Sequence, residues 1–310
     1  MLRLGTRGSA LALWQAHFVA GRLPVPIEIV VVKTTGDVRQ DVPLSAVAGK
    51  GVFVREIEAA LLRGEVDMAV HSAKDLQSSD PDGLTIGAFC ERADPRDALV
   101  SPHGGWNELP HGVTVATSAP RRVAQLAHLR PDLRFVPIRG NVDTRLAKLE
   151  RGDADALVLA CAGLDRLNRD DVITERIPVS VCLPQVGQGA VAVQCRANDA
   201  ATLTLVRDAC DHTLTRAAVE AERAFLSRLG GGCTAPVAAH AVWEDGELLL
   251  QARVASPDGA RLLHTSAQGS AGRDLAEQVY VELLASGARA LLEALVPEIP
   301  IREPGPERVQ

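Results

Sequence analysis

Short apolar runs that alternate with helix-forming segments are the feature that most limits how this chain can fold. The run at 27–32 is rich in β-branched residues, and the segment 52–63 is amphipathic and is followed by Gly64. Such an alternation predicts an α/β domain whose mainly parallel sheet is buried between helices. In the first part of the chain we expect strands at residues 2–5, 27–32, 68–70 and 84–90, with helices over 10–23 and 52–63.

The same alternation starts again after the charged segment 91–96, which suits a crossover linker. A Gly-rich segment, 183–190, then leads into a strand at 190–194 and indicates a return to the first unit. Two crossovers side by side can act as hinges. In the second unit we expect strands at 113–117, 134–138 and 157–160, with helices that start near residues 118, 142 and 162. A last helix, over 199–209, is expected to complete the first unit.

The remainder of the chain has a different pattern. A long helix is expected over 213–229, capped by Asp211, with Glu222 on its polar side. Three alternating runs follow, joined by Asp-Gly pairs that are typical of β-hairpins. We therefore predict two doubly wound lobes, the first made of residues 1–92 plus 189–210 and the second of residues 96–186. Residues 211–310 are expected to form a small α+β domain with strands at 237–242, 248–254 and 262–266 and a helical tail over 271–295.

Charge and composition argue against nucleic acid as a partner and leave an acidic small molecule open. The formal net charge of −6 at pH 7 disfavours general affinity for a phosphate backbone. Lysine supplies four of the 33 cationic side chains, so arginine dominates. Codon bias explains much of that excess, yet the planar guanidinium also suits carboxylates wherever several arginines cluster.

The amino terminus and the cysteines indicate a soluble protein of a reducing compartment. Residues 1–7 hold no apolar signal core, and no apolar run approaches the ~20 residues that a bilayer requires. The six cysteines are scattered without a C-x-x-C pair, so we expect neither a zinc site nor a disulfide framework. We therefore expect a cytoplasmic protein with no metal and no membrane partner, and a monomer suffices.

Asp75 is the candidate for acid–base chemistry. The apolar run 68–70 breaks at once into His71, Ser72, Ala73, Lys74 and Asp75, as at the end of a strand that opens into a cleft. A carboxylate held among cations can transfer a proton or stabilise a developing positive charge. The alternative is a surface aspartate in an ordinary turn.

Arginines recur where strands end and helices begin. Arg121 and Arg122 fall in the first turn of a helix that Ser118 is expected to cap, where positive charge opposes the helix dipole. A bound anion would relieve that conflict, although a solvated pair is the alternative. Similar positions at strand ends or helix starts are held by Arg7 and Ser9, by Arg139, Asn141 and Arg145, and by Arg166.

Two Gly-containing loops carry further candidates. Three glycines, 230–232, precede Cys233, which suggests a thiol at a loop tip rather than in a core; a buried cysteine after a helix end is the alternative. The other five cysteines have apolar or helical surroundings and are expected in cores. The long polar segment 33–51 suggests a mobile lid with Lys50 near its hinge.

Taken in order, these stretches resemble the porphobilinogen deaminase (hydroxymethylbilane synthase) family over essentially the whole chain. Each motif is weak alone, but their order and spacing are specific. They are Gly5-Thr-Arg-Gly-Ser, Leu11-Ala-Leu-Trp-Gln-Ala, Gly49-Lys-Gly-Val-Phe, His71-Ser-Ala-Lys-Asp, Arg121-Arg122, Arg139-Gly-Asn-Val, Val186-Gly-Gln-Gly-Ala, and Glu222-Arg through Gly231-Gly-Cys-Thr-Ala-Pro.

The resemblance implies two periplasmic-binding-protein-like lobes and a transferase that joins four porphobilinogen molecules head to tail with loss of ammonia, in tetrapyrrole (haem) biosynthesis. It also implies a dipyrromethane cofactor, made from substrate and held by a thioether to Cys233. Asp75 would be catalytic. The implied cofactor contacts are Lys74, Ser118, Arg121, Arg122 and Arg145, and the implied substrate contacts are Arg7, Ser9, Arg139 and Arg166. The family commonly has a second serine and a proline where this chain has Ala119 and Gln77, which puts one hydroxyl contact and the rigidity after Asp75 in doubt.

Three other functions share some of these features. A non-catalytic bilobed anion-binding protein would have the lobes and the arginines, but it would not need Cys233 or a third domain. A transcriptional regulator would need a helix-turn-helix segment, for which no spare chain exists. A thiol hydrolase would need a histidine paired with Cys233, and none lies close in the sequence.

Overall fold

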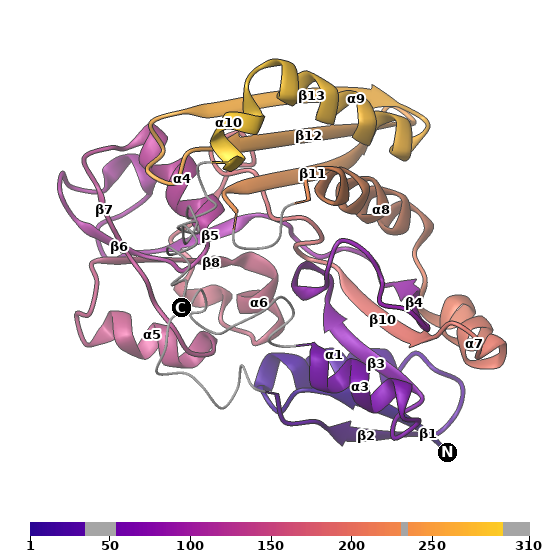
Figure 1. Ribbon diagram of the computed structural model, residues 1–310. Coiled ribbons are helices and arrows are strands. Elements are labelled where there is room, and N and C mark those ends of the chain that lie inside the picture. The colour runs from indigo at the N-terminus through magenta and orange to yellow at the C-terminus, as the bar shows by residue number, and fades with distance from the viewer. Residues whose placement is uncertain (35–53, 231–234, 294–310) are drawn as a thin grey trace, which may run out of the picture.

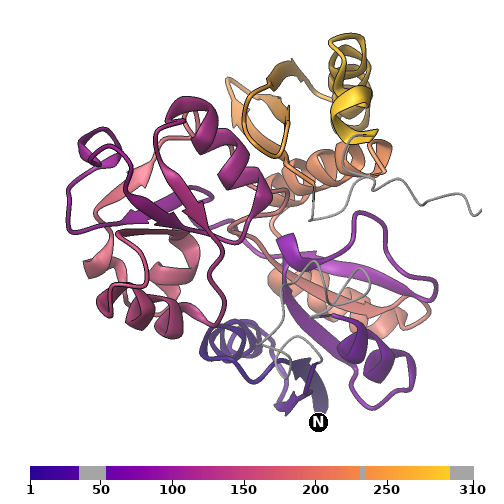
Figure 2. The same cartoon turned by 60° about the vertical axis from the view of Figure 1, so that its left-hand side comes forward.

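The computed structural model describes residues 1–34, 54–230 and 235–293. Lys50 and Cys233, both singled out above, lie outside the described residues. Two α/β lobes lie side by side, and a smaller α+β domain packs against both of them (Figures 1 and 2). The predicted fold class is confirmed. Within the described residues, no helix is long and apolar enough to cross a membrane.

The first lobe contains a five-stranded mixed sheet in the order β2-β1-β3-β10-β4. Strand β10 runs antiparallel to both β3 and β4, while the other pairs are parallel. Helices α1 and α7 pack on one face, and α3 packs on the other. The elements are β1 (Leu2–Thr6), α1 (Ala10–Ala20), β2 (Ile27–Val31), α3 (Arg55–Leu62), β3 (Met68–Ser72), β4 (Leu84–Phe89), β10 (Val191–Arg196) and α7 (Ala200–Cys210).

The second lobe repeats this arrangement, with strand order β7-β6-β8-β5-β9 and β5 antiparallel to its neighbours. In each lobe, the strand that follows a crossover, β10 or β5, is fourth in the strand order and runs antiparallel to both of its neighbours. Helices α5 and α6 cover one face and α4 covers the other. The elements are β5 (Asp97–Val100), β6 (Thr114–Ala116), α4 (Pro120–Leu129), β7 (Arg134–Val136), α5 (Val142–Glu150), β8 (Ala156–Ala160), α6 (Cys161–Arg166) and β9 (Glu175–Ile177), with single 3-10 turns at Trp106–Glu108 and Asp170–Val172.

The third domain is a three-stranded antiparallel sheet in the order β11-β12-β13, covered by helices α8 and α9. The first hairpin turns at Asp245 and Gly246, both with positive φ, as the Asp-Gly signal predicted. The elements are α8 (Thr213–Arg228), β11 (Val237–Glu244), β12 (Glu247–Ala255), β13 (Leu262–Gly269), α9 (Gly272–Ala285) and α10 (Ala288–Glu293).

Several local predictions were wrong. Strands β5 and β9 were missed because each is very short and β5 follows directly on a charged linker. Strand β2 was expected to be buried, but it lies at the sheet edge, where Val31 is 52% exposed. The helical tail is not continuous, since Gly287 adopts φ +96° between α9 and α10. His212, rather than Asp211, caps α8; the Asp211 carboxylate accepts from the Phe89 amide instead.

Glu222 was expected on the polar side of α8, but its side chain is 0% exposed. It accepts a hydrogen bond from Arg92 at 2.6 Å, and the amides of Gly187 and Ala241 also donate to it. Burial alone would raise the pKa of Glu222, yet Arg92 and His240 outweigh burial and lower it to about 2. The Glu222 carboxylate on α8 thereby connects both crossovers, through Arg92 and Gly187, to the third domain.

Candidate active site

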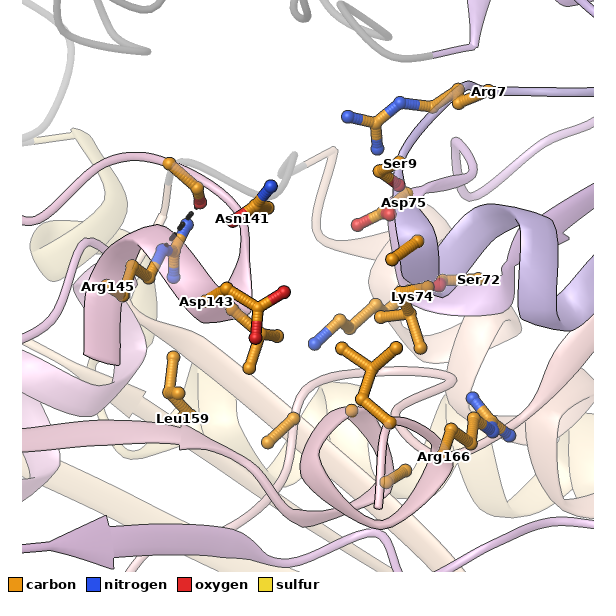
Figure 3. A pocket seen from close by; sticks show the side chains of 18 of the residues that line it. Arg7, Ser9, Ser72, Lys74, Asp75, Asn141, Asp143, Arg145, Leu159 and Arg166 are labelled. Carbon is orange, nitrogen blue, oxygen red and sulfur yellow. Dashed lines mark hydrogen bonds between the residues drawn. The ribbon is translucent and has the colours of Figure 1, made fainter. Parts of the chain in front are cut away.

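A cavity of about 740 Å³ lies between the two lobes and is lined by both (Figure 3). Lys74 and Asp75 face Asn141, Asp143 and Arg145 across it. From the first lobe the polar lining residues are Arg7, Ser9, Lys33, Ser72, Lys74 and Asp75; from the second they are Arg122, Arg139, Asn141, Asp143, Arg145 and Arg166.

Asp75 reaches this cavity because β3 ends there. The strand passes into a single 3-10 turn, Ala73–Asp75, which turns the next side chains toward the second lobe. The return crossover packs tightly on this turn, so that a Cβ at Gly187 would lie 3.0 Å from the Ala73 backbone, and Gly187 itself has φ +71°. Only glycine meets both demands without strain. The predicted opening of this strand into a cleft is confirmed.

Lys74 is held beside Asp75 by a hydrogen bond to the return crossover, from a residue that was not among the predicted contacts. Its Nζ donates to Gln188 Oε1 at 3.3 Å, and Gln188 Nε2 donates to the carbonyl of Pro95. Gln188 therefore connects the return crossover, 183–190, to the crossover at 91–96 that leaves the first lobe. Burial, with a further contribution from Arg122, lowers the pKa of the Lys74 ammonium to about 8.

The arginines of the second lobe are crowded. Arg145 donates from Nε to the Gly140 carbonyl at 2.8 Å, and burial together with Arg122 and Arg139 lowers its pKa to about 10. Arg139 Nη1 and Arg122 Nε are buried without a hydrogen-bond partner in the part of the chain that the structure describes. Cations crowded together along one cavity wall favour the binding of an anion.

The paired arginines of α4 have different surroundings. Arg121 does not line the cavity; both of its terminal nitrogens bond Asp97, at 2.7 and 2.9 Å. Arg122 bonds the same carboxylate at 2.7 Å but does line the cavity. The anion that relieves the helix-dipole conflict is thus Asp97, which sequence reasoning missed because it lies in the overlooked strand β5.

Ser118 also has an internal role, and its predicted capping role was wrong. Ala119 is the N-cap of α4, without a side-chain hydrogen bond. The Ser118 hydroxyl instead donates to the Ile138 carbonyl and accepts from the Ile138 amide at 2.9 Å. It does not line the cavity. Ser118 therefore ties the start of α4 to the end of β7.

The first-lobe candidates and Arg166 do line the cavity. Ser9 caps α1 and accepts from the Ala12 amide at 3.3 Å. Asn141 caps α5 and accepts from the Thr144 amide at 2.9 Å. Arg166 donates to the Gly189 carbonyl at 2.7 Å and lies over the Trp14 ring, 5.4 Å from its centroid, so it contacts both lobes.

A dipyrromethane group fits this lining. Its carboxylates would meet cationic side chains that outnumber the carboxylates Asp75 and Asp143, and Asp143 is already paired with Arg169 at 3.0 Å. The five cysteines that the structure describes are all buried, as predicted, and none lines the cavity.

Comparison with known families agrees with this lining. The model of the porphobilinogen deaminase dipyrromethane cofactor binding domain matches residues 2–204, and that of the porphobilinogen deaminase C-terminal domain matches residues 216–285. The chain belongs to the porphobilinogen deaminase family. Residues 2–204, which include both lobes' cavity linings, are thus this family's dipyrromethane cofactor-binding region.

Individual porphobilinogen deaminases are similar over nearly the full chain. That of Pelotomaculum thermopropionicum is 50% identical over 277 residues, 87% of this chain and 88% of the relative. That of Geobacter sulfurreducens is 47% identical, over 94% of this chain and 93% of the relative. Among solved structures, the VFT2 domain of Bordetella pertussis BvgS is similar with a TM-score of 0.42 and 17% identity, over 67% of this chain and 85% of that one.

Proposed function

We propose that this protein joins four porphobilinogen molecules head to tail, with loss of one ammonia each time, to give hydroxymethylbilane for tetrapyrrole biosynthesis. The observation that carries the proposal is that Asp75 lines the same cavity between the lobes as a dense set of cationic side chains. Each pyrrole of such a chain carries two carboxylates, so the cavity and its ligand have opposite charge.

Asp75 is the group that we assign to the chemistry. Loss of ammonia from the aminomethyl group of the substrate leaves a positive charge shared by the pyrrole ring. The carboxylate of Asp75 stabilises that charge through the ring N–H and then accepts the proton released when the new C–C bond forms. Arg7 and Arg139, which also line the cavity, hold the acidic arms of the ring in place.

The cofactor-binding assignments follow the geometry. Lys74, Arg122 and Arg145 line the cavity and bind cofactor carboxylates directly, while Arg7, Ser9, Arg139 and Arg166 contact the incoming substrate. Arg121 and Ser118 support the site rather than touching the ligand, because neither lines the cavity; the terminal nitrogens of Arg121 bond Asp97, and the Ser118 hydroxyl bonds Ile138. When bound through Cys233, the cofactor supplies a pyrrole with a free α-carbon as the nucleophile.

A non-catalytic bilobed anion-binding protein is the second candidate, because the cavity between two lobes suits it as well. The two functions differ in what happens to the ligand. Purified protein incubated with porphobilinogen is expected to release one ammonia for each substrate consumed and one hydroxymethylbilane for every four. Binding of porphobilinogen without release of ammonia would reject the transferase and favour the binding protein.

A further inference from the structure

Arg166 belongs to the second lobe, but it is held by the first. Its helix, α6, packs on α1 of the first lobe, where a Cβ on Gly163 would lie 3.7 Å from the Leu11 side chain. The guanidinium donates from Nη2 to the Gly189 carbonyl at 2.7 Å and lies over the Trp14 ring, 5.4 Å from the ring centroid. In Figure 3 the Arg166 side chain runs from α6 toward the first-lobe side of the cavity.

Trp14 is part of a stack that runs along α1. Phe18 lies one helical turn after it, and the two rings are stacked with their centroids 5.0 Å apart and 19° between their planes. One turn further on, the guanidinium carbon of Arg22 lies 3.6 Å from the centroid of the Phe18 ring. Trp14 is half-buried and does not line the cavity. An effect of its ring on a ligand in the cavity therefore has to pass through Arg166.

The charge of Arg166 is available to a ligand. Asp165, its neighbour in sequence, gives its two oxygens to Arg176, at 2.6 and 2.9 Å. Within the part of the chain that the structure describes, the one hydrogen bond of Arg166 uses Nη2. An aromatic face attracts a guanidinium without using its N–H donors and without neutralising it. Trp14 thus holds Arg166 in a way that a carboxylate partner, such as that of Arg121, does not.

We propose that Trp14 is a positioning residue for the substrate, because its ring holds the Arg166 guanidinium where it meets a carboxylate of each incoming porphobilinogen. The inference rests on the proposed function and extends it to a residue outside the cavity lining. A long arginine side chain has many rotamers, and fixing it before the substrate arrives lowers the entropy that binding has to overcome. Stacking also fixes the plane of the guanidinium, on which two-point contact with a carboxylate depends.

The test starts from the steady-state kinetics of Trp14→Leu. Leucine keeps an apolar side chain at this half-buried position but removes the ring face. KM for porphobilinogen should rise about three- to tenfold, while kcat stays within about twofold. Trp14→Phe, which keeps a smaller ring, should recover part of the loss. The control is Arg22→Met, which removes the cation from the other ring of the stack, outside the cavity lining, and should leave KM at its native value.

A double-mutant cycle separates positioning of Arg166 from a general effect on the fold. Arg166→Met should raise KM by itself. Adding Trp14→Leu to that variant should change KM by less than about twofold, because the ring then has no guanidinium to hold. An unchanged KM in Trp14→Leu alone would overturn the inference, and so would a rise of the same size in both backgrounds.

If Trp14→Leu fails to fold, Trp14→Phe takes its place, paired with Arg166→Lys, which keeps the charge but lacks the planar face. KM should then rise about two- to threefold in Trp14→Phe and not rise further in the double variant; no rise, or an equal rise in both backgrounds, would overturn the inference. A native protein that turns over porphobilinogen while the cycle fails rejects this inference alone. A native protein that does not consume porphobilinogen rejects the proposed function and this inference with it.

Discussion

Asp97 and Arg121 form a buried, two-point ion pair: the carboxylate accepts from both terminal guanidinium nitrogens, at 2.7 and 2.9 Å. Arg122 and Gln188 donate to the same carboxylate. Burial opposes ionisation, but the charges of Arg121 and Arg122 outweigh it and hold the pKa of Asp97 well below its usual range. The first strand after the crossover thus fixes the helix that presents Arg122 to the cavity.

Replacing this carboxylate should destabilise the fold. In Asp97→Asn two buried guanidinium groups lose their counter-charge, which typically costs about 3–5 kcal/mol. Urea unfolding measures the loss. Asp153→Asn is the matched control, because its pair with Arg151 is largely exposed and should contribute little. Equal stability of the two variants would mean that Asp97 does not organise α4.

Asp75→Asn should nearly abolish turnover and leave the fold intact. The amide keeps the size of the side chain but can neither stabilise the ring cation nor accept the proton. Steady-state assays and circular dichroism measure the two properties. Asp143→Asn is the control, since Asp143 lines the same cavity but is paired with Arg169. Near-normal turnover in Asp75→Asn would remove Asp75 from its assigned role.

Turnover at low substrate concentration should fall as the pH rises through about 8. Burial and Arg122 lower the pKa of Lys74 to about 8, so its charge is present below that pH and disappears above it. Because we assign Lys74 to a cofactor carboxylate, loss of that charge-assisted hydrogen bond should lower kcat/KM for porphobilinogen roughly tenfold between pH 7 and 9. In Lys74→Arg the guanidinium stays charged, and kcat/KM should vary much less. A kcat/KM profile that is equally flat in both proteins would contradict the assignment.

Glu222 should make stability depend on pH in acid. Its pKa of about 2 lies below the ordinary glutamate value of 4.5, so ionised Glu222 stabilises the fold above pH 4.5 and loses that effect as the pH falls toward 2. The shift corresponds to on the order of 3 kcal/mol. Native protein should therefore exceed Glu222→Gln in unfolding free energy at pH 7, and the gap should shrink at pH 4 and pH 3. Glu220→Gln, on the same helix, is the control; a gap independent of pH would refute the account.

Periodic features predicted most of the fold. Alternation of apolar runs with amphipathic segments located the principal strands and helices of both lobes, and the Asp-Gly pair at Asp245 and Gly246 located the first hairpin of the third domain. Such signals arise from contacts close in the sequence, which a single chain reveals directly. Strand β5 lacks them: it has four residues, and it is specified by pairing with β8 and β9.

The site was predictable where a residue directly follows a strand or starts a helix. Asp75, Arg139 and Arg145 were identified in that way, and all line the cavity. Burial of charge was not predictable, because it depends on partners remote in sequence. Glu222 is paired with Arg92, 130 residues away, and Gln188 bonds Lys74 at a separation of 114 residues.

The most direct measurement of the central claim is the intact mass of the purified protein, native and Cys233→Ala. If acidic pyrroles are assembled on this chain, the native protein weighs more than its sequence by two linked pyrroles, and Cys233→Ala weighs what its sequence predicts. A native mass equal to that of the bare chain, or the same added mass on Cys233→Ala, would contradict the account.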